Sequence, residues 1–198
     1  MLTVVTSGKA APGVTTATWA LALTWPGPVL VADCDPAGGD MGPGLLAGRV
    51  SSEHGLLSWS TSARRGVPAL TAASMLAQHV VELPERREVW FLPGFATSTQ
   101  GFSFTDEIWE RLALALARSS AAVGRDALVD AGRLVGDRGN WPVLRAADQV
   151  LLAVRPEHQL RIAIVDDGMG IAETASAGVG LASMRERARE LGGTLELE

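Results

Sequence analysis

The chain has 198 residues, of which 47% are hydrophobic and 20% are charged, and this balance excludes an intrinsically disordered protein. The length suffices for one α/β domain, or for one domain and a fragment. A net charge of −5 disfavours broad binding to nucleic acid or to an anionic membrane. Cys34 is the one cysteine, no apolar run approaches the ~20 residues of a membrane span, and the N-terminus lacks a signal-peptide pattern. We therefore expect a cytoplasmic protein without stable membrane insertion.

The N-terminal segment predicts a phosphate-binding loop. An apolar run at residues 2–5 predicts a buried strand, and residues 15–24 predict a helix, with the glycine-containing stretch 7–16 between them. A strand, a glycine-rich turn and a helix N-terminus form a cradle for phosphate, because free backbone N–H groups and the helix dipole point at the anion. Lys9, the only lysine of the sequence, lies in this loop. The standard P-loop has Gly-Lys-Ser/Thr at the helix start, where this chain has Gly13-Val14-Thr15.

Acidic residues follow two further predicted strands. Residues 29–32 predict a strand that leads into Asp33 and Asp35, and residues 127–129 predict one that ends at Asp130. Ligands of open α/β sheets bind beyond the carboxyl ends of the strands, so we interpret these carboxylates as functional, with Asp130 near a Mg²⁺ ion. The alternative is that they only cap turns at the strand ends.

The rest of the chain to about residue 156 continues to alternate strands and helices. We predict the following elements: a helix at 67–80, a strand at 88–92, a connecting loop at 95–104, a helix from 106 to about 122, a short helix at 141–147 and a strand at 149–154. His54 and His79 are expected at the surface or at caps, since no cluster of metal ligands lies near them. The alternation predicts an α/β fold with a mainly parallel sheet and right-handed crossovers.

Together these segments resemble the ParA/MinD group of P-loop ATPases over residues 1–157, although the family normally continues with further strands and helices. The resemblance places Lys9 on the family's leading lysine and Asp33 on the aspartate that orients the attacking water, so both are implied catalytic residues. It implies Thr15 and Asp130 as Mg²⁺ ligands. The implied nucleotide-binding residues of the loop are Gly8, Lys9, Gly13, Val14, Thr15 and Thr16.

The resemblance implies binding of ATP with Mg²⁺ and a homodimer with nucleotide between the subunits. Val14 stands where the family has its second lysine, and Ala10 and Ala11 stand where it has glycines. Losing one preorganised cation can cost on the order of 3 kcal/mol, or about a hundredfold in rate. We therefore expect nucleotide binding with slow hydrolysis, and whether ATP is hydrolysed at all stays open. A non-enzymatic P-loop scaffold is an alternative.

Residues 158–198 resemble a different family, the ATPase domain of sensor histidine kinases in two-component systems. An Asp-x-Gly-x-Gly turn at 166–170 and a later Gly-x-Gly at 178–180 carry the resemblance. The implied nucleotide-binding residues are Asp166, Gly168, Gly170, Gly178 and Gly180. Both halves would be incomplete domains, so we predict a short βαβ-like C-terminal piece on a truncated P-loop sheet. A gene fusion, a sequence-assembly error and a deliberate joining all stay open. If the activity belongs to this segment, the alternative function is that of an ATP-binding segment of a sensor kinase.

Overall fold

The computed structural model describes residues 1–8, 13–38, 41–42, 54–63, 66–83, 88–134 and 139–154, with Arg189 and Thr194. The chain divides into two units, Met1–Gln159 and Leu160–Glu198, and only those last two residues of the second unit are described. The histidine-kinase-like hypothesis for residues 158–198, with its glycine turns, therefore lies outside the described residues.

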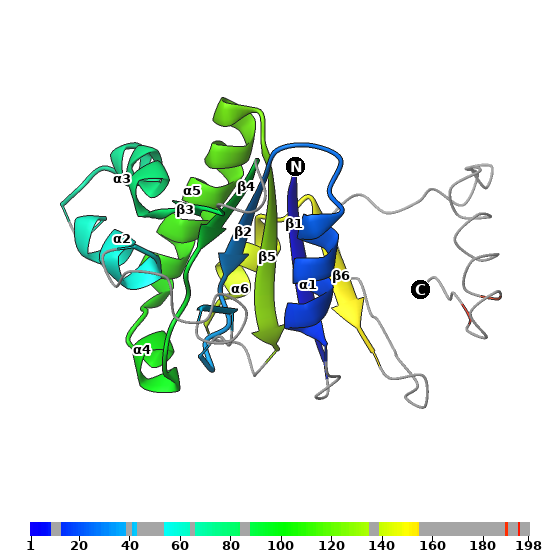
Figure 1. The fold of residues 1–198 in the computed structure, drawn as a ribbon. Coiled ribbons are helices and arrows are strands. Elements are labelled where there is room, and N and C mark those ends of the chain that lie inside the picture. The colour runs from blue at the N-terminus through cyan, green and yellow to red at the C-terminus, as the bar shows by residue number, and fades with distance from the viewer. Residues whose placement is uncertain are drawn as a thin grey trace, which may run out of the picture. The chain divides into compact units, whose positions relative to one another are not determined.

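The described strands form a six-stranded sheet in the order β3-β4-β2-β5-β1-β6 (Figure 1). All neighbouring strands run parallel except the β3–β4 pair, which is antiparallel. This confirms the predicted α/β fold with a mainly parallel sheet. The bounds are β1 Leu2–Ser7, β2 Val29–Asp33, β3 Val81–Glu82, β4 Val89–Leu92, β5 Asp126–Arg133 and β6 Gln149–Ala153.

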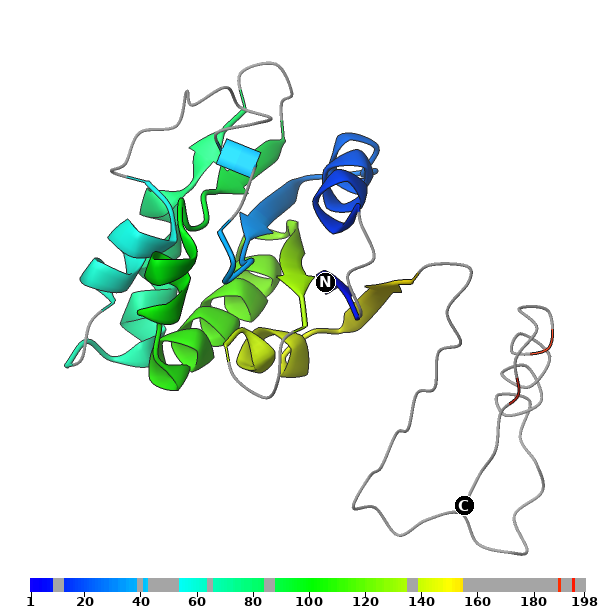
Figure 2. The same ribbon diagram turned by 90° about the horizontal axis from the view of Figure 1, so that it is seen from below.

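Helices cover both faces of this sheet. Figure 2 shows α1 on one face and α5 and α6 on the other. Side chains of β2 alternate between these two layers: Leu30 packs into the core beneath α5, whereas Val29 and Val31 pack into the core on the α1 face. Because both faces are covered, β2 is buried throughout and its sequence is apolar from Val29 to Ala32. The bounds are α1 Val14–Leu23, α2 Leu56–Ser62, α3 Ala69–Met75, η2 Leu76–His79, α4 Ser98–Phe102, α5 Asp106–Val123 and α6 Trp141–Arg145.

Helix α5 confirms the prediction made from its apolar stripe and its acidic first turn. Thr105 is the N-cap, and its Oγ1 accepts a hydrogen bond from the backbone N–H of Ile108 at 3.4 Å. Trp109, Leu112 and Leu116 are fully buried against the sheet. No helix of the described part of the chain is long and apolar enough to cross a membrane.

The segment 95–104 differs from the prediction of a plain loop, since it contains α4. Phe95 and Phe104 are buried and pack edge to face, with ring centroids 4.7 Å apart. Phe95 also contacts the Trp109 ring of α5, at 5.9 Å between centroids. This aromatic cluster fixes the connector on the core, whereas Phe102 on α4 is exposed.

The helix predicted at 67–80 and the position expected for His79 differ from the structure in detail. The helix expected at 67–80 begins at Ala69, and its last turn, Leu76–His79, is a 3₁₀-helix. His79, expected at the surface or at a cap, is the last residue of this 3₁₀-helix and is only 8% exposed, and its Nδ1 is hydrogen-bonded to the Ser58 hydroxyl.

Candidate functional site

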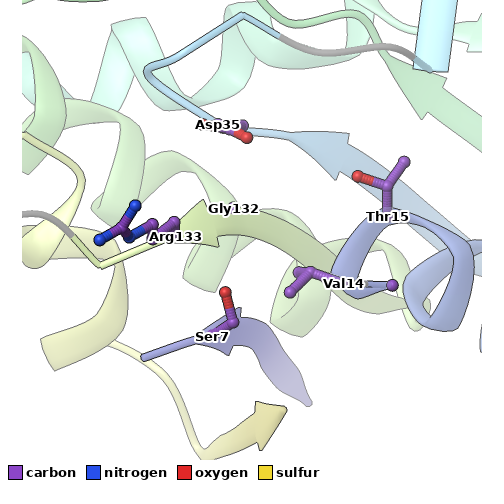
Figure 3. Close-up of a pocket in the computed structure, with 7 residues that line it drawn as sticks. Ser7, Val14, Thr15, Asp35, Gly132 and Arg133 are labelled. Carbon is purple, nitrogen blue, oxygen red and sulfur yellow. The ribbon is translucent and has the colours of Figure 1, made fainter. Parts of the chain in front are cut away.

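The carboxyl ends of β1, β2 and β5 meet at one edge of the sheet. Strand register pairs Ser7 of β1 with Arg133 of β5, and Asp33 of β2 with Asp130 of β5. A pocket of about 210 Å³ opens at this edge, and we call it the strand-end pocket (Figure 3). It is lined by Ser7, Gly13, Val14, Thr15, Asp35, Gly132 and Arg133.

Helix α1 begins beside this pocket at a glycine. Gly13 is the N-cap, with φ 99° and ψ 8°, a left-handed conformation that residues with a Cβ rarely adopt. A glycine N-cap has no side chain to accept from the first-turn N–H groups, so these donors are available to an anion in the pocket. Val14 and Thr15 follow at the start of the helix, and Val14 is only 6% exposed.

Thr15 and Asp130, the two residues implied as Mg²⁺ ligands, lie together. The Asp130 carboxyl accepts a hydrogen bond from the backbone N–H of Gly132 at 2.8 Å, and the Thr15 hydroxyl lies near enough to lower the pKa of this carboxyl. Asp130 is 1% exposed, and burial raises the pKa of its carboxyl above the ordinary value. The nearby Thr15 hydroxyl and the hydrogen bond from Gly132 oppose this rise in pKa, whereas the Asp35 carboxylate adds to it.

This pair is not a complete metal site by itself. Within the described ranges, no group of three or more His, Cys, Asp and Glu side chains is placed to hold a metal ion. A hydroxyl and a carboxylate are the hard oxygen donors that Mg²⁺ prefers, and Mg²⁺ commonly takes one or two protein ligands and completes its shell with water and phosphate oxygens. The residues therefore fit a metal ion that arrives with a phosphate ligand.

Cys34 lies near three carboxylates at this edge of the sheet. It is fully buried, and burial, followed by the charges of Asp33, Asp130 and Asp35, raises the pKa of its thiol well above the usual value. Its backbone N–H donates to the carbonyl of Asp130 at 2.8 Å, which extends the pairing of β2 with β5. The aspartates predicted after the strands thus lie near one another at this edge of the sheet.

Asn140 fixes the same strand ends and was not predicted. Its side-chain amide donates to the carbonyl of Cys34 at 2.9 Å and to that of Ala131 at 2.8 Å. The residue is 3% exposed, so these bonds cross-link the ends of β2 and β5 away from water. A single asparagine in a loop carries no motif, and its role follows only from the meeting of residues 34 and 131 in space.

Gly132 and Asp35 form the floor of the pocket. Gly132 has φ 58°, and a Cβ at this position would lie 2.5 Å or less from the carboxyl atoms of Asp35. The Asp35 Oδ1 accepts from the backbone N–H of Ala37 at 2.8 Å, which holds the carboxylate in place. Both the backbone angle and the close approach require glycine here. Gly132 was not predicted as a site residue, although it lies two positions after Asp130.

Only some of the other residues implied for the site line the strand-end pocket. Gly13, Val14 and Thr15 line the pocket, whereas Gly8 and Thr16 are described but do not. Asp33 is 2% exposed and lies beside Asp130 in the sheet, outside the pocket lining. Lys9 and the C-terminal residues Asp166, Gly168, Gly170, Gly178 and Gly180 lie outside the described residues, so their roles stay predictions.

The sheet order and the helices on both faces define an α/β fold with a mainly parallel sheet and a pocket at its strand ends. The chain matches no protein-family model and no curated protein. Among solved structures, the chain is similar to the MinC:MinD cell division protein complex of Aquifex aeolicus, with a TM-score of 0.54 and 20% identity over 79% of this chain. It is also similar to a ParA family ATPase from Chlorobium tepidum TLS, with a TM-score of 0.53 and 20% identity over 76% of this chain. It spans 57% and 59% of those two chains. The likeness establishes a ParA/MinD-like fold.

Proposed function

We propose that this protein binds ATP together with Mg²⁺ in the strand-end pocket. The observation that carries the proposal is the proximity of Thr15 and Asp130, at the point where α1 begins and β5 ends. The pair supplies metal ligands, and the first-turn N–H groups of α1 supply donors for phosphate oxygens. Bound Mg²⁺ would neutralise part of the phosphate charge. The ParA/MinD-like fold supports a nucleotide as the ligand.

We further propose that hydrolysis of the bound nucleotide is slow. Val14 presents an apolar side chain to the pocket, so it offers no charge to the phosphates. Asp33 stays the candidate for orienting a water molecule, and Lys9 the candidate for a catalytic cation. We also propose a homodimer with the nucleotide between its subunits. The resemblance to ParA/MinD ATPases is what supports this part of the proposal. A scaffold without enzymatic activity predicts the same binding and no phosphate release.

The binding proposal is tested by titrating the full chain with a fluorescent ATP analogue, with and without Mg²⁺. Thr15→Val removes the hydroxyl and keeps the side-chain shape, so we expect it to abolish the gain in affinity that Mg²⁺ gives the wild type. Thr71→Val is the matched control, because Thr71 is exposed on α3 and does not line the pocket. If the wild type gains no affinity from Mg²⁺, the proposed metal site is wrong.

A further inference from the structure

Negatively charged side chains lie at and around the strand-end pocket. Asp35 lines it, and the carboxyls of Asp33 and Asp130 lie at the neighbouring strand ends. A nucleoside triphosphate would add several negative charges to a site that already holds these carboxylates, and one Mg²⁺ would offset only two of them. A cationic side chain at the pocket would therefore favour phosphate binding, in addition to the Mg²⁺ ion and the Lys9 expected in the loop.

Arg133 is the cationic side chain among the described residues that line this pocket. It is the last residue of β5 and pairs in register with Ser7 of β1. The next residue, Leu134, donates its backbone N–H to the carbonyl of Ser7 at 2.9 Å. The backbone on both sides of Arg133 is thus fixed to β1, the strand that leads into the phosphate-binding loop.

The guanidinium of Arg133 is available to a ligand. The side chain is exposed, and it makes no hydrogen bond or ion pair with any residue in the described part of the chain. In the view of Figure 3, Arg133 and Thr15 lie on opposite sides of the pocket, with Ser7 and Gly132 between them. An anion held by Arg133 would therefore sit over the strand ends, on the side of the pocket away from α1.

We propose that Arg133 binds the terminal phosphate of the bound nucleotide and so makes the site selective for triphosphate over diphosphate. This inference rests on the proposed function. Guanidinium binds phosphate oxygens through two parallel N–H donors, which an ammonium cannot reproduce. Arg133 supplies from the end of β5 the positive charge that Val14 does not supply from the start of α1. A diphosphate lacks the group that Arg133 contacts, and it gains nothing from this arginine.

The test is the ratio of ATP to ADP affinity, measured by calorimetric titration of the full chain in the presence of Mg²⁺. We expect Arg133→Ala to lower this ratio about tenfold, the scale of one charge-assisted bond. Arg118→Ala is the control: Arg118 is exposed late in α5, which ends where β5 begins, so it lies toward the opposite edge of the sheet. It should leave the ratio unchanged.

The outcomes separate the two proposals. A wild type that binds neither nucleotide overturns the proposed function. A wild type that binds ATP, with an unchanged ratio in Arg133→Ala, overturns only the role of Arg133, and so does an equal loss of both nucleotides. Loss of ATP binding with ADP binding retained supports the role. If the alanine variant does not fold, Arg133→Gln keeps the aliphatic stem of the side chain and is read by the same ratio.

Discussion

Substituting Gly132 by alanine tests how tightly the floor of the pocket is built. The new methyl group would lie 2.5 Å or less from the Asp35 carboxyl atoms, so that carboxylate must move. Its movement breaks the hydrogen bond from the Ala37 N–H to Asp35 Oδ1, worth about 1 kcal/mol. The left-handed backbone at φ 58° adds about 1–2 kcal/mol for a residue with a Cβ. We therefore expect Gly132→Ala to lower the free energy of unfolding by about 2–3 kcal/mol.

Gly124 provides a matched control for the backbone part of this cost. It has φ 66°, close to that of Gly132, but a Cβ there would meet no atom within 4 Å. Gly124→Ala should therefore cost only the backbone strain, about 1–2 kcal/mol. Urea unfolding followed by circular dichroism gives both values. In the Asp35→Ala background, the cost of Gly132→Ala should fall to that of Gly124→Ala. Equal losses for the two glycine variants in the wild-type background would refute the close contact.

Three further predictions concern the strand ends and the C-terminal segment. Because burial raises the pKa of Asp130, the folded chain keeps this proton to higher pH than the unfolded chain, so its contribution to stability falls as pH rises through the raised pKa. Asp130→Asn should therefore gain stability relative to the wild type in thermal unfolding as the pH rises above about 4, the ordinary pKa of an aspartate, and a constant difference would contradict this. Asn140→Ala leaves the carbonyls of Cys34 and Ala131 without their donor and should lower the free energy of unfolding by about 1–3 kcal/mol in urea, whereas a neutral effect would exclude the cross-link. Asp166→Asn should leave ATP affinity within about twofold of the wild type, and a loss of tenfold or more would assign the site to the C-terminal segment.

The buried strands could be predicted because both faces of the sheet are covered. In β2 all five positions are buried, and the first four are apolar, so the run of apolar residues alone predicts the strand. The predicted third strand was too short, because the structure extends β5 to Arg133. Those last residues are held by pairing with β1, and a glycine and an arginine show no strand pattern of their own. Strand β3 has two residues, too few for any periodicity.

The candidate site could be predicted only in part, because some of its residues are recognisable from local sequence patterns and others are not. Thr15 and Asp130 belong to local patterns, a loop before a helix and an acid after a strand, and such patterns can be recognised in one segment. Asn140 and Arg133 acquire their roles from partners distant in the sequence, such as Cys34 and Ser7. The order of the strands decides which of these residues meet, and single-segment patterns do not encode that order.

The most direct test of the proposed function is the effect of Mg²⁺ on ATP affinity in the full chain. Calorimetric titration of the wild type and of Thr15→Val, with Mg²⁺ and with a chelator, measures it. We predict that Mg²⁺ raises the affinity of the wild type for ATP and leaves that of Thr15→Val unchanged, while Thr71→Val behaves as the wild type. Equal gains from Mg²⁺ in the wild type and Thr15→Val would contradict the assignment of the metal to Thr15 and Asp130.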